Sequence, residues 1–206
     1  MEYGGVGRPD QFVEMQSGPE CGFEAVENAI QMILPASNDV SELDLKPWAH
    51  QNGFVTWAGD QATFAVAGYQ PALRRWGIDC AWTAVNHVHL ANTLRQNRVT
   101  IGVVDGNVLD PATYRDPRSY HAIVITNLIS TADPAIPIIG YCVVDSNFPA
   151  QIRRFRAEHL AAALTAYGPT PLLVTHVPVA PENQANYEIM IAHPDGRTEF
   201  RFSPTP

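Results

Sequence analysis

The stretch QSGPECGFEAVENAI, residues 16–30, is the part of the chain around which the predicted fold is organised. Proline fixes φ and glycine accepts almost any φ, so Gly18 and Pro19 interrupt regular structure at the start of this stretch. The apolar residues that follow recur at the spacing of one helix face and its border: Cys21, Ala25, Val26, Ala29, Ile30 and Ile33. We therefore expect a helix from about residue 19 to residue 34, with Cys21 in its first turn.

Cys21 has two possible roles in such a helix. A thiol in the first turn meets unpaired backbone N–H groups and the positive end of the helix dipole, and both lower its pKa. Gln16 lies five residues upstream and can donate a hydrogen bond to an oxyanion formed when Cys21 attacks a carbonyl. A free cysteine is also a common residue of a buried helix face. This stretch alone leaves both roles open.

The composition narrows the class of protein. A chain of 206 residues with 46% hydrophobic residues is long enough for one domain with a substantial core. The net charge is −8, and Lys46 is its one lysine, so no basic patch indicates nucleic-acid binding. No basic region followed by an apolar core begins the chain, and no apolar run is long enough for a membrane span. We expect a cytoplasmic protein, or one secreted by a route without a cleavable signal.

The three cysteines do not form a disulfide framework, and no cysteine or histidine pattern has the spacing of zinc ligands. We therefore expect no metal and no cofactor. Cys80 and Cys142 lie within apolar runs, which favours a place for both in the hydrophobic core.

Periodicity along the chain predicts helices first and strands second. Helical spacing covers residues 41–50, 60–76, 89–97 and 153–167, and Gly68 and Pro71 indicate a kink or a split in the second of these. Strand patterns cover residues 78–85, 99–104, 120–130, 138–145 and 172–179, and residues 187–191 and 198–202 flank a turn as in a hairpin. This order favours an α+β fold, in which an N-terminal helical half packs on a C-terminal antiparallel sheet. A cleft between the two halves is the natural place for an active site.

Two polar residues stand at the far ends of two neighbouring strands. His121 begins the strand at 120–130, and Asp145 ends the strand at 138–145. If the two strands are antiparallel neighbours joined by the intervening loop, their far ends come together. This places the Asp145 carboxylate within reach of the His121 imidazole. Asn147 follows two residues later and is a second candidate for the same partner.

These residue types suit nucleophilic catalysis by a thiol. An imidazole takes the proton of a cysteine to give a thiolate–imidazolium pair. The imidazole needs a partner on its other nitrogen, and either Asp145 or Asn147 can fix its tautomer and orientation. Gln16 and the backbone N–H of Cys21 can hold the oxyanion. The predicted chemistry is therefore attack on a peptide or amide carbonyl.

The motifs Gln16…Cys21-Gly22, then YHAIV at 120–124, then VVDSN at 143–147, resemble the papain-like cysteine peptidase superfamily in kind and order. They are most similar to the branch of peptidase family C39, the bacterial enzymes that process bacteriocins. The resemblance covers roughly residues 11–167. It implies a papain-like fold in which Gln16 belongs to the oxyanion hole, Cys21 is the nucleophile, His121 the base and Asp145 the orienting residue.

The sequence departs from the pattern of that branch in two places. The 23 residues between His121 and Asp145 form a longer connection, which indicates an extended hairpin. Ser146 also stands where the family has a proline directly after the aspartate. We expect a single domain over residues 1–206, with a core at about 11–170 and a strand and hairpin extension at 171–206.

Three functions are compatible with this reading. The first is a cysteine peptidase that acts through a thioester acyl-enzyme on a peptide or protein substrate. The second keeps the fold but transfers the acyl group or deamidates glutamine, as transglutaminases, deamidases and toxin effectors do. The third is a non-catalytic peptide-binding module.

Overall fold

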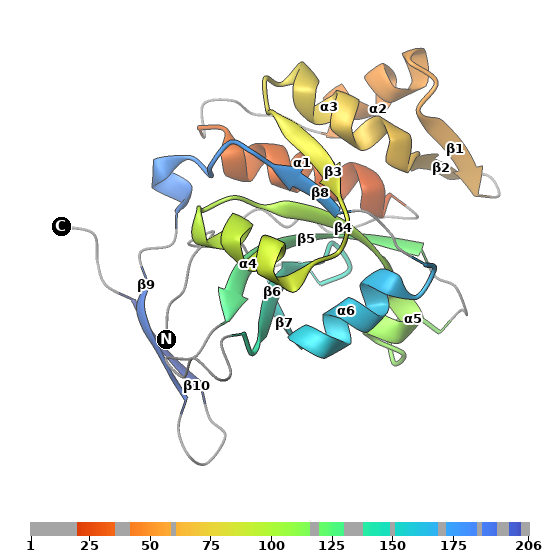
Figure 1. Ribbon diagram of the computed structural model, residues 1–206. Helices are drawn as coiled ribbons and strands as arrows, with labels where there is room; N and C mark the ends of the chain where they lie inside the picture. The colour runs from red at the N-terminus through yellow and green to blue at the C-terminus, as the bar shows by residue number, and fades with distance from the viewer. Residues whose placement is uncertain are drawn as a thin grey trace.

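The computed structural model describes residues 20–35, 42–58, 61–115, 120–129, 138–148, 151–168, 172–184, 187–192 and 198–202. In these residues the chain has the predicted α+β fold, in which helices pack on a six-stranded antiparallel sheet (Figure 1).

The N-terminal part is mainly helical. It contains α1 (Cys21–Ile33), α2 (Glu42–Gln51), the hairpin of β1 (Val55–Ala58) and β2 (Gln61–Phe64), a 3-10 turn (Val66–Gly68) and α3 (Tyr69–Arg75). The sheet and its other helices follow: β3 (Cys80–Thr83), α4 (His87–Arg95), β4 (Thr100–Asp105), α5 (Gly106–Leu109), β5 (Tyr120–Ile129), β6 (Gly140–Val144), β7 (Arg153–Arg156), α6 (Ala157–Thr165) and β8 (Leu172–Thr175). A 3-10 turn (Pro181–Asn183) and a hairpin of β9 (Tyr187–Ala192) and β10 (Thr198–Phe202) complete the described chain.

The strand order in the sheet is β3-β8-β4-β5-β6-β7. β5 is central to the site because it pairs with β4 on one side and with β6 on the other. β8 comes from the part of the chain that the sequence assigned to an extension, yet it lies inside the sheet, between β3 and β4.

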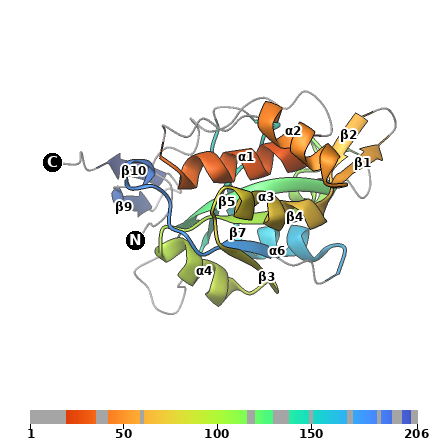
Figure 2. The same cartoon turned by 90° about the horizontal axis from the view of Figure 1, so that it is seen from above.

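Both faces of the sheet are buried, because alternate residues of its inner strands point to opposite sides. Val103 and Val124 belong to a core cluster that includes α1, α2 and α3. Val104 and Ile123 belong to a second cluster that includes α4 and α6. Figures 1 and 2 show the two groups of helices on opposite sides of the sheet. The helical half expected from the sequence thus covers one face, and α4 and α6 cover the other.

α1 is almost entirely buried and positions Cys21. Phe23 stacks on Phe64 with ring centroids 4.6 Å apart, which joins the start of α1 to β2. Lys46 of α2 pairs with Glu20, the residue directly before α1. The first turn of α1, where Cys21 lies, is therefore held from two sides.

The helix predicted at 60–76 is wrong over its first part. Residues 61–64 form β2, which pairs with β1 through Trp57 and Ala62 and through Val55 and Phe64. Only Tyr69–Arg75 is α-helical. Pro71 lies in the first turn of α3, where a backbone N–H would have no acceptor within the helix, so its absence costs no hydrogen bond. The apolar spacing that suggested one helix is produced by a hairpin, a turn and a short helix.

The helix predicted at 153–167 also begins later than expected. Residues 153–156 form the edge strand β7, in which Phe155 pairs with Tyr141 of β6. Helix α6 follows without a break. The remaining helices and strands predicted from the sequence are confirmed to within a few residues. Cys80 and Cys142 are fully buried, as predicted for core residues.

No helix among the described residues is long and apolar enough to cross a membrane.

Candidate active site

The antiparallel pairing of β5 and β6 brings the start of β5 beside the end of β6. His121 is the second residue of β5, and Asp145 directly follows Val144, the last residue of β6. His121 Nε2 lies 2.8 Å from Asp145 Oδ1. The side chains are 3% and 0% exposed, so this pair is shielded from water. The structure thus brings together the two residues that hairpin geometry placed at the same end of the sheet.

Cys21 lies against the other side of His121. The two residues line the same cavity, and the His121 imidazole and the Ala122 backbone both act to lower the pKa of the Cys21 thiol. Since Nε2 of His121 faces Asp145, Nδ1 is the nitrogen left for the thiol. The chain therefore places a thiol, an imidazole and a carboxylate in line.

A cavity of about 640 Å³ opens at Cys21 and His121. Its walls are mainly apolar or aromatic and include Phe64, Val66 and Tyr69. The cavity gives a substrate access to the sulfur, while the His121–Asp145 pair stays buried behind it.

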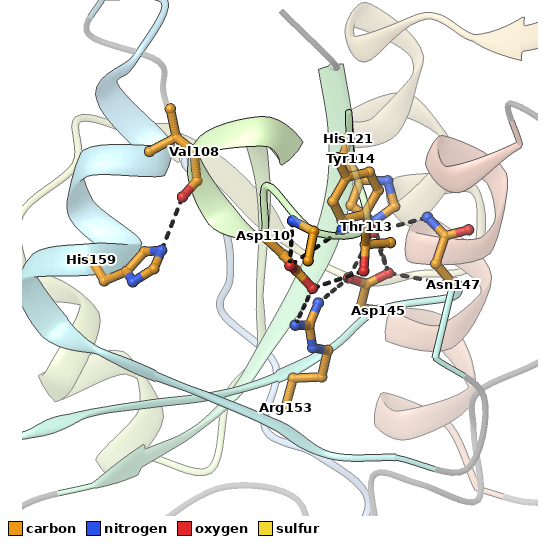
Figure 3. Close-up of polar contacts among 10 residues, drawn as sticks. Val108, Asp110, Thr113, Tyr114, His121, Asp145, Asn147, Arg153 and His159 are labelled. Carbon is orange, nitrogen blue, oxygen red and sulfur yellow. Dashed lines mark hydrogen bonds and ion pairs between the residues drawn. The ribbon is translucent and has the colours of Figure 1, made fainter. Parts of the chain in front are cut away.

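Tyr114 is a member of this site that the sequence reading missed. Its hydroxyl lies 2.8 Å from His121 Nε2, and 3.0 and 2.8 Å from the two carboxylate oxygens of Asp145 (Figure 3). The hydroxyl has one proton, which it donates to the carboxylate. The side-chain amide of Asn147 donates to the same hydroxyl at 2.8 Å. Tyr114 thereby bridges His121, Asp145 and Asn147.

Asp145 and Asn147, the two candidates for the partner of His121, make different contacts. Asp145 bonds His121 directly, whereas Asn147 contacts the other members of the group. The backbone N–H of Asn147 donates to Asp145 Oδ1 at 3.0 Å. Asn147 therefore supports Asp145 and Tyr114 and does not contact His121 itself.

Two further contacts fix the position of Tyr114. Asn107 Nδ2 donates to the Tyr114 backbone carbonyl at 2.7 Å. A Cβ added at Gly106 would lie 2.7 Å from the Tyr114 ring, so only glycine allows the ring to lie against this turn.

Arg153 of β7 donates to Asp110 Oδ2 at 2.7 Å and lies 3.5 Å from Asp145 Oδ2, as Figure 3 shows.

The electrostatics favour a thiolate–imidazolium pair. Burial raises the pKa of Cys21, but the hydrogen bond and positive charge of His121, together with the Ala122 backbone, outweigh it and leave the pKa lowered. Burial lowers the pKa of His121, but the hydrogen bonds and negative charges of Asp145 and Cys21 raise it to about 9. A low thiol pKa beside a high imidazole pKa means that the proton belongs on His121.

The supporting groups keep their usual charge states. Burial acts to raise the pKa of Asp145, yet the bond and charge of His121, with smaller contributions from Asn147 and Tyr114, hold it below its ordinary value. Burial and the Asp145 charge raise the pKa of Tyr114, so its phenol remains neutral and able to donate. Asp145 is therefore an anion whose lone pairs are largely occupied by donors.

The predicted oxyanion-hole residue Gln16 lies outside the described residues. Within those residues, no group of three or more histidine, cysteine, aspartate or glutamate side chains has an arrangement that could hold a metal ion.

Comparison with known proteins finds the same architecture elsewhere. No protein-family model matches the chain, and no curated protein matches it in sequence. Among solved structures, the crystal structure of a candidate C39-like peptidase from Bacillus anthracis matches with a TM-score of 0.57 over 87% of this chain and 100% of that chain. The identity is only 10%, so the likeness concerns the fold alone. The chain therefore shares its fold with that candidate C39-like peptidase.

Proposed function

We propose that this protein is a cysteine peptidase or amide hydrolase whose nucleophile is Cys21. The observation that carries the proposal is the group at the wall of one cavity, where Cys21 and His121 lie together, the imidazole lowers the thiol pKa, and His121 Nε2 lies 2.8 Å from the buried Asp145. His121 is the general base and acid, and Asp145 orients it. The likeness in fold to a candidate peptidase supports the same reading.

The first half of the reaction forms the acyl-enzyme. The Cys21 thiolate attacks the carbonyl carbon of the substrate, and the π electron pair moves onto the carbonyl oxygen. When this pair returns, the C–N bond breaks and the amine leaves with the proton that His121 donates. The product on the enzyme is a thioester at Cys21.

The second half releases the acid. His121, now neutral, takes a proton from water as the water oxygen attacks the thioester carbonyl. Collapse of this second tetrahedral intermediate breaks the C–S bond and restores the thiolate beside the imidazolium. Asp145 keeps the ring in the orientation that both transfers need, because it accepts the Nε2 hydrogen bond throughout.

The test uses casein as a general substrate and identifies the products by mass spectrometry. We expect hydrolysis, seen as new peptide termini, and its complete loss in Cys21→Ala. His121→Asn should lower the rate by about 10²–10⁴-fold, the usual contribution of a general acid–base residue. His176→Asn is the matched control, since His176 forms a comparable pair with Asp79 at 3.0 Å, but on the surface; this variant should keep the wild-type rate.

Other products would contradict the hydrolase assignment. Conversion of glutamine to glutamate without chain cleavage indicates a deamidase, and joined substrate molecules indicate acyl transfer. A wild-type protein that changes neither casein nor other peptides, with Cys21 no more reactive toward iodoacetamide than an exposed thiol, would indicate a binding module.

A further inference from the structure

Tyr69 places a second phenol beside the nucleophile. It is the first residue of α3, it is only 3% exposed, and it lines the cavity that contains Cys21. Its ring lies against Phe64, with centroids 5.2 Å apart. A Cβ added at Gly22 would lie 2.4 Å from the Tyr69 hydroxyl oxygen. The hydroxyl therefore lies directly against the residue that follows Cys21, at the first turn of α1.

Among the residues that the structure describes, the Tyr69 hydroxyl forms no hydrogen bond, and its oxygen is not one of the fully buried atoms without a partner, so it is open to the cavity. A buried phenol usually finds such a partner, because burying an unpaired hydroxyl is unfavourable. Tyr114, a second buried phenol of this cavity, meets that expectation with contacts to three side chains. The unpaired hydroxyl of Tyr69 at a cavity wall thus indicates a donor whose partner is a ligand.

The charge at Cys21 makes this phenol a dependable donor. Burial raises the pKa of Tyr69, and the negative charge of Cys21 raises it further. The hydroxyl therefore keeps its proton and can donate a hydrogen bond. A neutral hydrogen-bond donor beside the thiolate is well placed to stabilise the negative charge that develops on the carbonyl oxygen during the attack.

We infer that Tyr69 is a catalytic residue that donates a hydrogen bond to the carbonyl oxygen of the bond under attack. This inference rests on the proposed function and adds a residue to its machinery. As the Cys21 sulfur bonds to the carbonyl carbon, the π pair moves to the oxygen, and the Tyr69 O–H donates to this oxyanion. When the C–N bond breaks the pair returns, and Tyr69 retains its own proton throughout.

The test compares the wild type with Tyr69→Phe, which removes one oxygen atom and leaves the ring. We expect kcat to fall by about 10²-fold with little change in KM, since the lost bond forms chiefly in the transition state. Alkylation of Cys21 by iodoacetamide should keep the wild-type rate, because this reaction forms no oxyanion. Affinity for acetyl-leucyl-leucyl-norleucinal should fall at least about tenfold, because the thiolate adds to the aldehyde to give a tetrahedral adduct with a negatively polarised oxygen.

Tyr141→Phe is the matched control. Tyr141 is also a buried phenol, but its hydroxyl is 3.0 Å from His87 Nδ1, on the face of the sheet that α4 covers. This variant should keep the wild-type kinetics.

The possible results separate this inference from the proposed function. If the wild type hydrolyses peptides and Tyr69→Phe has the same kcat and the same aldehyde affinity, the role of Tyr69 is wrong and the peptidase remains. A higher KM at constant kcat would also overturn it, since it indicates ground-state binding. A slower alkylation in Tyr69→Phe indicates a disturbed Cys21 and overturns it as well. A wild type that neither hydrolyses peptides nor binds the aldehyde overturns both.

Discussion

The Tyr114 hydroxyl lies at the centre of the hydrogen-bonded group in the candidate site. It contacts the two residues that set the charge of the site, His121 and Asp145, and receives a further bond from Asn147. Hydrogen bonds to a charged group contribute more than neutral ones, about 1.5–3 kcal/mol each. The Tyr114–Asp145 bond is therefore expected to stabilise the protein only while Asp145 is ionised.

Tyr114→Phe tests this dependence on charge. We expect the free energy of unfolding near neutral pH to fall by about 1.5–3 kcal/mol. The pKa of Asp145 is lowered in the folded state, so the stability from its bonds is present above its unfolded pKa and is lost as pH falls through its folded pKa. The difference between wild type and variant should therefore shrink in acid. Urea denaturation over a pH series measures it.

Tyr120→Phe is the control for this series. Tyr120 is a surface phenol, and exposed substitutions usually change stability by less than about 0.5 kcal/mol. A loss in Tyr114→Phe that stays the same at every pH would show that the hydroxyl does not act through the carboxylate.

The thiolate–imidazolium pair gives the second prediction at this scale. Since the pKa of Cys21 is lowered, wild-type alkylation by iodoacetamide should be fast well below the pH at which an ordinary thiol reacts. In His121→Asn the burial of Cys21 is no longer opposed by an imidazolium, so the alkylation profile should shift to higher pH by at least about one unit. Rates measured from about pH 5 to about pH 10 decide this.

The thiolate–imidazolium pair also limits stability and activity at high pH. The pKa of His121 is raised from 6.5 to about 9 by folding, so its stabilising contribution is full below 6.5 and is lost as pH rises through about 9. The rate of hydrolysis should also fall as pH rises through about 9, because His121 then loses the proton that the leaving amine needs. A rate that is flat across this range would mean that another group is the general acid.

At the level of elements, β7 is connected to the segment that carries Tyr114. Arg153 bonds Asp110 at 2.7 Å, and both side chains are largely shielded from water. Arg153→Ala should therefore loosen residues 110–115, lower stability by about 1 kcal/mol and reduce kcat through Tyr114. Arg156→Ala, at an exposed position on the same strand, removes an equal charge and should have little effect. Equal losses in both variants would indicate a general effect of charge instead.

A helix or strand with one clear hydrophobic periodicity was predictable from the sequence. A segment that combines a hairpin, a turn and a short helix was not. α1 and β5 form where their spacing predicts, although α1 also buries the polar residues Glu24, Glu27 and Asn28. The segment 60–76 failed because Ala62, Ala65 and Tyr69 fall at helical spacing although a hairpin and a turn place them. Hairpin pairing is a contact between segments, which local periodicity does not measure.

The candidate site divides in the same way. His121 and Asp145 lie at the ends of paired strands, so their meeting follows from strand pairing, and Cys21 lies at the start of the helix that packs on that sheet. Tyr114 lies in an irregular loop, where no period fixes its direction. The available signal was a lone aromatic residue in a polar, proline-containing loop that leads into the His121 strand. Tyr114 contacts His121 and Asp145 because its side chain is buried, and the sequence alone does not show that it is buried.

For the whole molecule, a sheet covered on both faces explains how a small site stays rigid. Val103 and Ala122 pack against the α1 layer, and Val104 and Ile123 against the α4–α6 layer. Because interiors are close-packed, β5 has little room to shift relative to α1. The alignment of Cys21 with His121 is thus a property of the complete three-layer arrangement and depends on strands remote from the site.

Strand β8 allows a test of whether the alignment of Cys21 with His121 depends on strands remote from the site. It lies between β3 and β4, and all four of its residues are buried, in contact with both cores. Burying one leucine or valine contributes about 1.5–3 kcal/mol, so Leu172, Leu173 and Val174 together approach the whole stability of a typical domain, about 5–15 kcal/mol. A chain ending at residue 170 should therefore fail to fold, seen as a lost cooperative urea transition and lost selective alkylation of Cys21.

A chain ending at residue 184 is the control for this truncation. It keeps β8 and the segment in which the Val179 N–H donates to the Asn97 carbonyl and Asn183 Nδ2 donates to Met32, at the end of α1. Of the described residues, this truncation removes the β9–β10 hairpin, whose two strands pair with each other and lie outside the six-stranded sheet. We expect this shorter chain to unfold cooperatively, within about 1 kcal/mol of the full chain, and to keep its reactive Cys21. If the chain ending at 170 behaves the same way, β8 is dispensable, and the rigidity of the site must come from α1, β4, β5 and β6 alone.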